Sequence, residues 1–323
     1  YSSLNNTSIN LGLKERNFLG EGKRLLFEAS LSEKKNSYNI GVTEPYFLDR
    51  HLSLFGNIYD QESENSKGDV KTNKTGFDFG FGLKLNDISQ TIKYNFSNSE
   101  TTTAATSTAA SDTGEEGKEI TTSSITYGLF QDTRDNYFNP TSGYRWKFEN
   151  TLAGFGGDSQ YLRNQVRSTK FIEITDGWIM NLGGAGGHIL GIGDDIRIID
   201  RFFLGGTFLR GFEQSGVGPR DLITNDAVGG NWFYRGSVGL TFPLGLPNEF
   251  GIEGRVFSDA GSLGENDSSV ASITDTGSLR MSVGAGLLWS SPLGPMNLDF
   301  ARAIIKESFD QTEVVRFSVG TKF

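Results

Sequence analysis

The sequence predicts an all-β protein, a transmembrane antiparallel up-and-down β-barrel. Three observations carry this prediction. Apolar and polar residues alternate with a period of two along most of the 323 residues, as in strands with one apolar face. Tight turns alternate with long polar or irregular loops, as in outer-membrane barrels. No run of about twenty consecutive apolar residues is present, so a helical membrane span is not predicted.

Composition narrows the class of protein further. The mean hydropathy of −0.34 is compatible with a membrane barrel, because only alternate residues of such a barrel face lipid. With 30 basic and 39 acidic residues the net charge is −9, which argues against a nucleic-acid binder, since such a protein needs clustered Lys and Arg. The chain has no cysteine and therefore no disulfide or cysteine metal site.

Fifteen strands are predicted from the alternation. Because bacterial barrels have an even number of strands, Tyr1 and Ser2 are interpreted as the end of a first strand that is mostly missing from this chain. In chain order the predicted strands contain residues 8–14, 24–32, 37–44, 52–58, 77–82, 92–97, 125–129, 144–149, 160–175, 178–190, 235–242, 250–259, 281–289, 296–301 and 315–323.

The strand at 144–149 helps to separate a membrane barrel from a soluble β-sandwich. Its sequence, YRWKFE, alternates aromatic and charged residues strictly. A sandwich would place the aromatic side chains in its core, whereas a barrel would place them at the membrane interface and the charges in a wet lumen. The pattern favours the barrel and leaves the soluble sandwich as the alternative.

Several segments between the strands are predicted to be loops. The polar stretches 61–74 and 260–277 are interpreted as exposed connections. Residues 101–117 are of low complexity, rich in Thr, Ala and Ser, and cannot bury enough apolar surface to order themselves, so we expect a mobile loop there. Asp176-Gly177 has the composition of a two-residue hairpin turn. The stretch 132–143 is predicted to form a structured turn.

The longest irregular segment is 191–230, called the lumen loop below. A connection of about forty residues is far longer than usual and indicates a functional loop with its own packing. It contains Arg210 within a glycine-rich stretch. A guanidinium group is always charged and carries five donors, so Arg210 needs carboxylate partners if the loop is enclosed. From the pattern alone, a solvated loop with no such partner is an equal alternative.

Several ordered motifs resemble the Omp85 superfamily, and the resemblance covers essentially the whole chain. Within the superfamily, the motifs resemble the branch of outer-membrane protein assembly factors most. The motifs are NFLGEG at 17–22, TEPYF at 43–47, DTRD at 132–135, NPTSG at 139–143, LRGF at 209–212, FSDAG at 257–261 and the C-terminal Phe323.

The resemblance implies a sixteen-stranded barrel in the bacterial outer membrane, preceded by periplasmic POTRA domains. Residues 1–323 are then the barrel domain, and the POTRA domains belong to a longer chain. The family folds the loop at 191–230 into the lumen of the barrel.

The resemblance also assigns a contact inside the lumen. Arg210, followed by Gly211 and Phe212, is expected to meet Asp259 on the barrel wall. We call Arg210 and Asp259 the latch pair. Family members often have a second acidic residue on the preceding strand, but the matching position here is Gly239. A latch with a single carboxylate is therefore expected.

The last predicted strand is expected to form one side of a seam. Val315, Phe317, Val319 and Phe323 share one face of this strand, and Gly320 together with the shortness of the strand would weaken closure of the seam. An open seam exposes unpaired backbone N–H and C=O groups, which an incoming strand can satisfy by β-augmentation. Unpaired backbone is costly in hydrocarbon, so pairing is strongly favoured there.

The resemblance implies that the protein folds and inserts β-barrel proteins into the outer membrane without ATP. The implied partners are unfolded β-barrel substrates, outer-membrane lipids, accessory lipoproteins and the POTRA domains. No cofactor, metal or nucleic acid is expected. His51 and His188 have no nucleophile placed with them, so no enzyme activity is predicted. The alternatives are a TamA-like translocase, a two-partner secretion pore and, more distantly, a passive porin.

Overall fold

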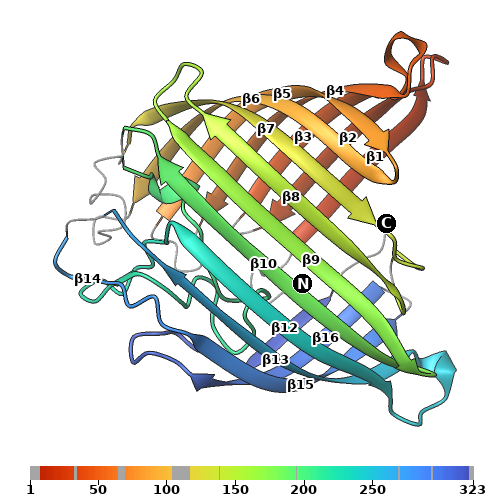
Figure 1. Ribbon diagram of the computed structural model, residues 1–323, viewed down its shortest axis with the longest axis vertical. Helices are drawn as coiled ribbons and strands as arrows, with labels where there is room; N and C mark the ends of the chain where they lie inside the picture. Colours follow the sequence, from red (N-terminus) through yellow and green to blue (C-terminus); the bar gives the residue numbers. More distant parts are fainter. Residues whose placement is uncertain are drawn as a thin grey trace.

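A single curved sheet of fifteen antiparallel strands makes up the fold (Figure 1). The structure is a computed structural model that describes residues 8–32, 35–64, 70–103, 117–137, 139–193, 195–267, 270–291 and 294–319. The strands are β1 (Ser8–Phe18), β2 (Lys23–Ser32), β3 (Lys35–Glu44), β4 (Leu52–Glu64), β5 (Val70–Leu85), β6 (Ile88–Thr103), β7 (Glu119–Asp132), β8 (Gly143–Ala153), β9 (Tyr161–Thr175), β10 (Trp178–Gly191), β12 (Trp232–Pro243), β13 (Ile252–Gly264), β15 (Arg280–Ser291), β16 (Gly294–Ile305) and β17 (Val315–Val319).

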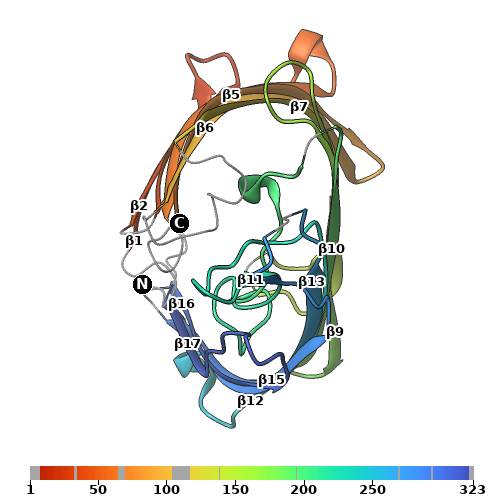
Figure 2. The ribbon, with the colours of Figure 1, turned by 90° about the vertical axis from the view of Figure 1, so that its left-hand side faces the viewer.

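The strands follow one another around the sheet in chain order, which is an up-and-down topology. Figure 2 shows the sheet bent round a central space, with β1 and β2 on the same side as β16 and β17. The predicted fold class and all fifteen predicted strands are confirmed. The strand end expected at Tyr1 and Ser2 lies outside the described residues. The smaller elements are the paired strands β11 (Arg220–Asp221) and β14 (Ile273–Thr274) and the 3-10 turns η1 (Phe47–Asp49), η2 (Ile198–Asp200) and η3 (Asn248–Phe250).

Apolar side chains cover the outside of the sheet, and polar ones face the space within it. On β5, Phe77, Phe79 and Phe81 are each more than 40% exposed, whereas Asp78 between them is 9% exposed. This is the reverse of a soluble sandwich, in which the apolar face of a strand is buried. The soluble sandwich is therefore the wrong alternative. In the described part of the chain, no helix is long and apolar enough to cross a membrane.

The strands reach further into the predicted loops than their sequence pattern indicated. β4 and β5 extend through most of 61–74, where Gln61 pairs with Lys74 and the side chains of Glu62 and Lys71 form an ion pair. A backbone ladder needs no apolar side chains, and cross-strand charge pairs support it. The prediction of a loop was wrong for these residues.

Two other loop predictions need the same correction. β6 continues to Thr103, and Thr101 is buried rather than exposed. The middle of that loop, 104–116, lies outside the described residues. β13 likewise runs to Gly264, into the segment 260–277, and β14 lies within the same segment. The strand predicted over the glycine run 183–187 is present as part of β10, and the turn at Asp176-Gly177 joins β9 to β10.

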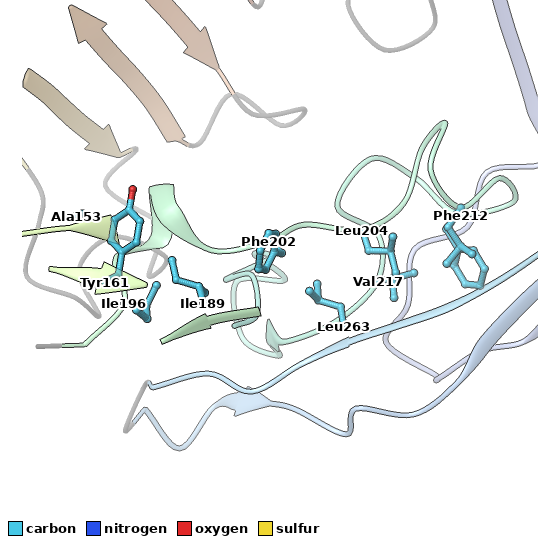
Figure 3. Packing of buried hydrophobic residues seen from close by; sticks show 10 residues of the cluster. Ala153, Tyr161, Ile189, Ile196, Phe202, Leu204, Phe212, Val217 and Leu263 are labelled. Carbon is cyan, nitrogen blue, oxygen red and sulfur yellow. The ribbon is translucent and has the colours of Figure 1, made fainter. Parts of the chain in front are cut away.

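The apolar core lies inside the sheet, between the lumen loop and the wall (Figure 3). Phe202, Leu204, Leu209 and Phe212 of the loop are each at most 4% exposed. They belong to a cluster whose remaining members are Ala153, Tyr161, Ile189, Ile196, Val217 and Leu263. Burial of these side chains favours docking of the loop by about 1.5–3 kcal/mol for each large one.

Candidate functional site

The lumen loop lies within the curved sheet, against the side formed by β9, β10, β12 and β13 (Figure 2). It leaves β10 at Gly191 and returns at Trp232. Backbone bonds fold it on itself: Phe202 pairs with Gly230, and the N–H of Gly206 donates to the carbonyls of Phe212 and Glu213. The Gly206 bonds close a loop at residues 206–213, which contains Arg210.

Arg210 reaches Asp259 on β13 with both its side chain and its backbone. Its Nε donates to Oδ2 of Asp259 over 2.7 Å, and its Nη2 donates to Oδ1 over 2.7 Å. The backbone N–H of Arg210 donates to Oδ2 over 3.1 Å. The guanidinium and the carboxylate thus form a bidentate pair, the strongest common geometry for an ion pair in proteins.

The surroundings of the latch pair exclude most water. The side chain of Asp259 is 2% exposed and that of Arg210 is 15% exposed. The guanidinium carbon of Arg210 lies 3.4 Å from the centre of the Phe257 ring, a cation–π contact. Ser237 on β12 donates its hydroxyl to Oδ1 of Asp259 over 2.7 Å and accepts from Nη2 of Arg210 over 3.2 Å. Asp259 therefore accepts four hydrogen bonds.

Sequence reasoning missed Ser237 and Phe257 as parts of this site. A signal for Phe257 was present in the alternation, because Phe257 lies two residues before Asp259 on the same face of β13. Ser237 is the register partner of Asp259 across β12 and β13. That register depends on where the turn at 244–251 places the two strands, which the alternation alone does not determine.

The two residues after Arg210 fit the wall closely. Gly211 has φ +88, a left-handed conformation that favours glycine, and a Cβ there would lie 3.0 Å from the Cβ of Ser282. Phe212 is fully buried in the apolar cluster. The structure thus brings together all four residues predicted around the loop, Arg210, Gly211, Phe212 and Asp259.

The position of the missing second acid is filled from the neighbouring strand. A Cβ at Gly239 would lie 2.6 Å from Oδ1 of Asn181 on β10, so the Asn181 side chain occupies this space. Both residues line a cavity of about 740 Å³ that also reaches Arg210 and extends to the turns at 139–141 and 244–251. In the described structure, Asp259 is the carboxylate that pairs with Arg210.

The seam residues occupy the last strand of the sheet. β17 is five residues long in the described structure, and Arg316, which points to the lumen side, is 8% exposed. Gly320 and Phe323 lie outside the described residues. The three other predicted seam residues pair with β16 as Val315 with Phe300, Phe317 with Leu298 and Val319 with Met296.

Asp135 and Asp200, which lie outside the strands, have perturbed pKa values. Backbone and hydroxyl donors of Ser142 and Thr141 lower the pKa of Asp135, in the turn between β7 and β8, to about 2. Burial raises the pKa of Asp200 in η2, against the opposing influence of Lys74 and Arg163. In the described residues, no group of three or more His, Asp or Glu could hold a metal ion.

A sheet with an apolar exterior, a polar interior and a loop bound inside defines a bacterial outer-membrane β-barrel with an occupied lumen. The chain belongs to the Omp85 superfamily, because the domain model of that superfamily matches residues 17–323.

Two named relatives align with most of this chain. The chain is 30% identical over 318 residues, 97% of its length, to the outer membrane protein assembly factor BamA of Neorickettsia risticii, of which it covers 43%. It is 28% identical over 243 residues, 74% of its length, to the sorting and assembly machinery component 50 homolog A of Xenopus laevis, of which it covers 51%. The chain thus spans about half or less of each of these relatives.

Solved structures agree on the fold. BamA of Haemophilus ducreyi lacking POTRA domains 1–3 superposes with a TM-score of 0.88 at 22% identity, covering all of this chain and 69% of that one. CdiB of Acinetobacter baumannii superposes with a TM-score of 0.63 at 14% identity, over 98% of this chain and 57% of that one.

Proposed function

We propose that this barrel folds and inserts β-barrel proteins into the outer membrane as part of a longer assembly factor. The observation that carries the proposal is the 30% identity to a BamA assembly factor over 97% of the chain. The alignment covers 97% of this chain, so the likeness extends over most of the barrel, including the lumen loop. We further propose that accessory lipoproteins, lipids and POTRA domains are its partners. We also propose that it has no enzyme activity.

The two ends of the sheet support a mechanism of strand templating. Among the described residues, β1 pairs with β2 and β17 pairs with β16, and no ladder joins β1 to β17. An unpaired strand edge accepts a further strand. An incoming substrate strand would satisfy backbone groups that are costly to leave unpaired in hydrocarbon.

Reversible cross-linking of the seam tests this function. Cysteines are placed in β1 and β17 of the full-length protein in liposomes, and folding of a small outer-membrane barrel is followed by its heat-modifiable migration. Oxidation should slow folding and reductant should restore it. Folding at the same rate in both states would contradict the seam, and no acceleration over protein-free liposomes would contradict the assembly function.

Single-channel conductance separates an assembly factor from a passive porin. A passive porin would show a large, steady conductance that changes in the lumen loop do not affect. An assembly factor whose loop occupies the lumen should conduct little while the loop is docked, and Arg210→Ala should raise its conductance.

A further inference from the structure

The connection between the last two strands leaves the wall of the barrel. This β16–β17 connection comprises residues 306–314. The ladder between the two strands covers Met296 to Phe300 of β16, and the N–H of Ala301 donates to the carbonyl of Val314 over 2.9 Å. β16 itself continues to Ile305, paired with β15. The chain before β17 therefore turns away from β16.

The β16–β17 connection pairs instead with the lumen loop, directly after Arg210. An antiparallel bridge joins Phe212 to Thr312. The same tip of the loop is thus held by the latch pair on one side and by the connection on the other. The backbone bonds run from Glu213 N to Gln311 O (3.0 Å), from Gln311 N to Gly216 O (2.9 Å) and from Glu313 N to Gly211 O (3.2 Å).

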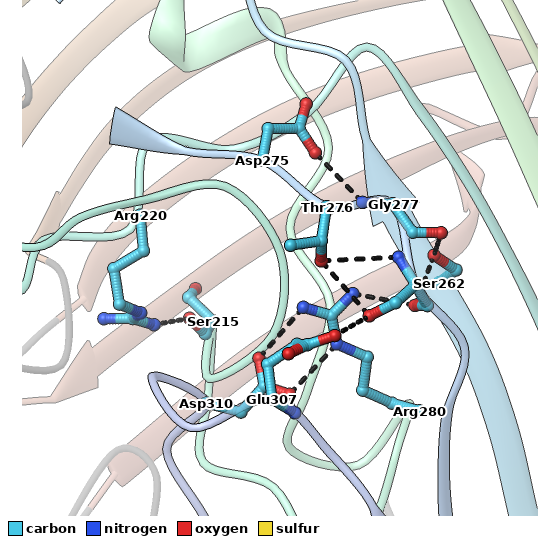
Figure 4. A network of polar contacts seen from close by, with 10 residues as sticks. Ser215, Arg220, Ser262, Asp275, Thr276, Gly277, Arg280, Glu307 and Asp310 are labelled. Carbon is cyan, nitrogen blue, oxygen red and sulfur yellow. Dashed lines mark hydrogen bonds and ion pairs between the residues drawn. The ribbon is translucent and has the colours of Figure 1, made fainter. Parts of the chain in front are cut away.

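A fully buried ion pair fixes the connection to the wall (Figure 4). The side chains of Arg280, at the start of β15, and Asp310 are both 0% exposed. Nε and Nη2 of Arg280 donate to the two oxygens of Asp310 over 3.0 and 3.2 Å, and Nη1 donates to the carbonyl of Ser278 over 2.7 Å. Asp310 also accepts the backbone N–H of Glu307 over 2.8 Å.

The energetics of this pair make it a strong constraint. Removing one partner of a buried ion pair leaves the other charge uncompensated in the protein interior, which is strongly destabilising. At the other end of the connection, Glu313 forms an ion pair with Arg316 of β17. A continuous series of contacts therefore runs from β15 through the connection to both the lumen loop and the last strand.

We propose that Arg280 and Asp310 are positioning residues for the latch pair. They hold the β16–β17 connection where it pairs with residues 211–216, so that the lumen loop and β17 are coupled. Release of the loop then loosens the last strand, and a change at β17 is transmitted to the loop, because coupling between two sites is reciprocal. The coupling itself is independent of the proposed function, and only its role in opening the seam rests on that function.

A cysteine reporter tests the coupling in the full-length protein in nanodiscs. Val217 of the loop is 2% exposed, and these 323 residues contain no cysteine, so Val217→Cys gives a single buried thiol within the barrel. Asp310→Asn should raise its rate of modification by a maleimide about tenfold. The matched control is Asp275→Asn, an exposed carboxylate at the same end of the barrel, which should change the rate less than about twofold.

The reverse direction is measured by hydrogen exchange of the connection. Arg210→Ala should accelerate exchange in the peptide 306–316, and the double variant Arg210→Ala with Asp310→Asn should add less than the sum of the two single effects. Additive effects would show two independent packing defects and overturn the proposal. Faster exchange in Asp310→Asn with an unchanged rate at the reporter would also overturn it.

A second variant keeps the proposal testable if Asp310→Asn does not fold. Gln311→Pro removes the N–H that donates to Gly216 and leaves the ion pair intact. Ser308→Pro places a proline in the same connection at a residue outside this pairing. Gln311→Pro should expose the reporter and Ser308→Pro should not, and equal rates would contradict the coupling. All these readouts are made without substrate, so they report on the coupling even if the insertion assay fails.

Discussion

The backbone N–H of Arg210 donates to the carboxylate of Asp259 over 3.1 Å, and the guanidinium of Arg210 donates to the same carboxylate through two hydrogen bonds of 2.7 Å each. One carboxylate thus fixes the course of the loop backbone as well as the direction of the side chain. Because Asp259 is 2% exposed, water cannot replace Arg210 as its partner without opening the loop.

Arg210→Ala and Asp259→Asn should therefore weaken docking of the lumen loop to a similar degree, by about 3 kcal/mol. Limited proteolysis of the loop in the folded protein measures this. Asp87→Asn, in an exposed turn, is the control and should be cleaved like the parent. Cleavage of Asp259→Asn at the parental rate would contradict the latch.

Gly211→Ala should also loosen the loop, by about 1–3 kcal/mol. The residue has φ +88, and the added Cβ meets Ser282 and Ala301. Gly184→Ala is the matched control, since a Cβ at Gly184 has open space around it. Thermal unfolding and proteolysis should distinguish the two variants, and equal stability of Gly211→Ala and the parent would show that the loop does not fit the wall closely there.

An acidic residue at position 239 should be tolerated only if Asn181 on the neighbouring strand β10 is replaced as well. Gly239→Glu alone should lower the folded yield, because its Cβ would lie 2.6 Å from Oδ1 of Asn181. Combined with Asn181→Ala, the glutamate has room near Arg210 and should slow proteolysis of the loop. A single Gly239→Glu variant that folds with parental yield would refute this steric explanation.

The turn between β7 and β8 should lose order in acid. The carboxylate of Asp135 accepts from Thr141 and Ser142, which lowers its pKa from 3.8 to about 2. A lowered pKa in the folded state means that this stabilisation is present above the ordinary pKa and is lost as the pH falls toward 2. Amide exchange of Thr141 and Ser142 should rise over that range. Asp135→Asn should abolish the pH dependence, and a dependence that persists in this variant would assign it to another group.

The fold followed from the sequence because lipid on one side and a polar lumen on the other impose the same alternation on every strand. The ends of the strands did not follow, since the ladder continues through polar pairs such as Gln61 and Lys74. Arg210 and Asp259 were predicted from motifs that resemble a family. Arg280 and Asp310 were not, because they lie 30 residues apart and only the inward course of the β16–β17 connection brings them together.

The most direct test of the account is the rate at which the full-length protein in liposomes folds a β-barrel substrate when the latch is broken. The account predicts that Asp259→Asn and Arg210→Ala lower this rate by the same factor, about tenfold or more, while Asp87→Asn folds substrate like the parent. The contradicting result is an Asp259→Asn protein that folds substrate at the parental rate although proteolysis shows that its lumen loop is released.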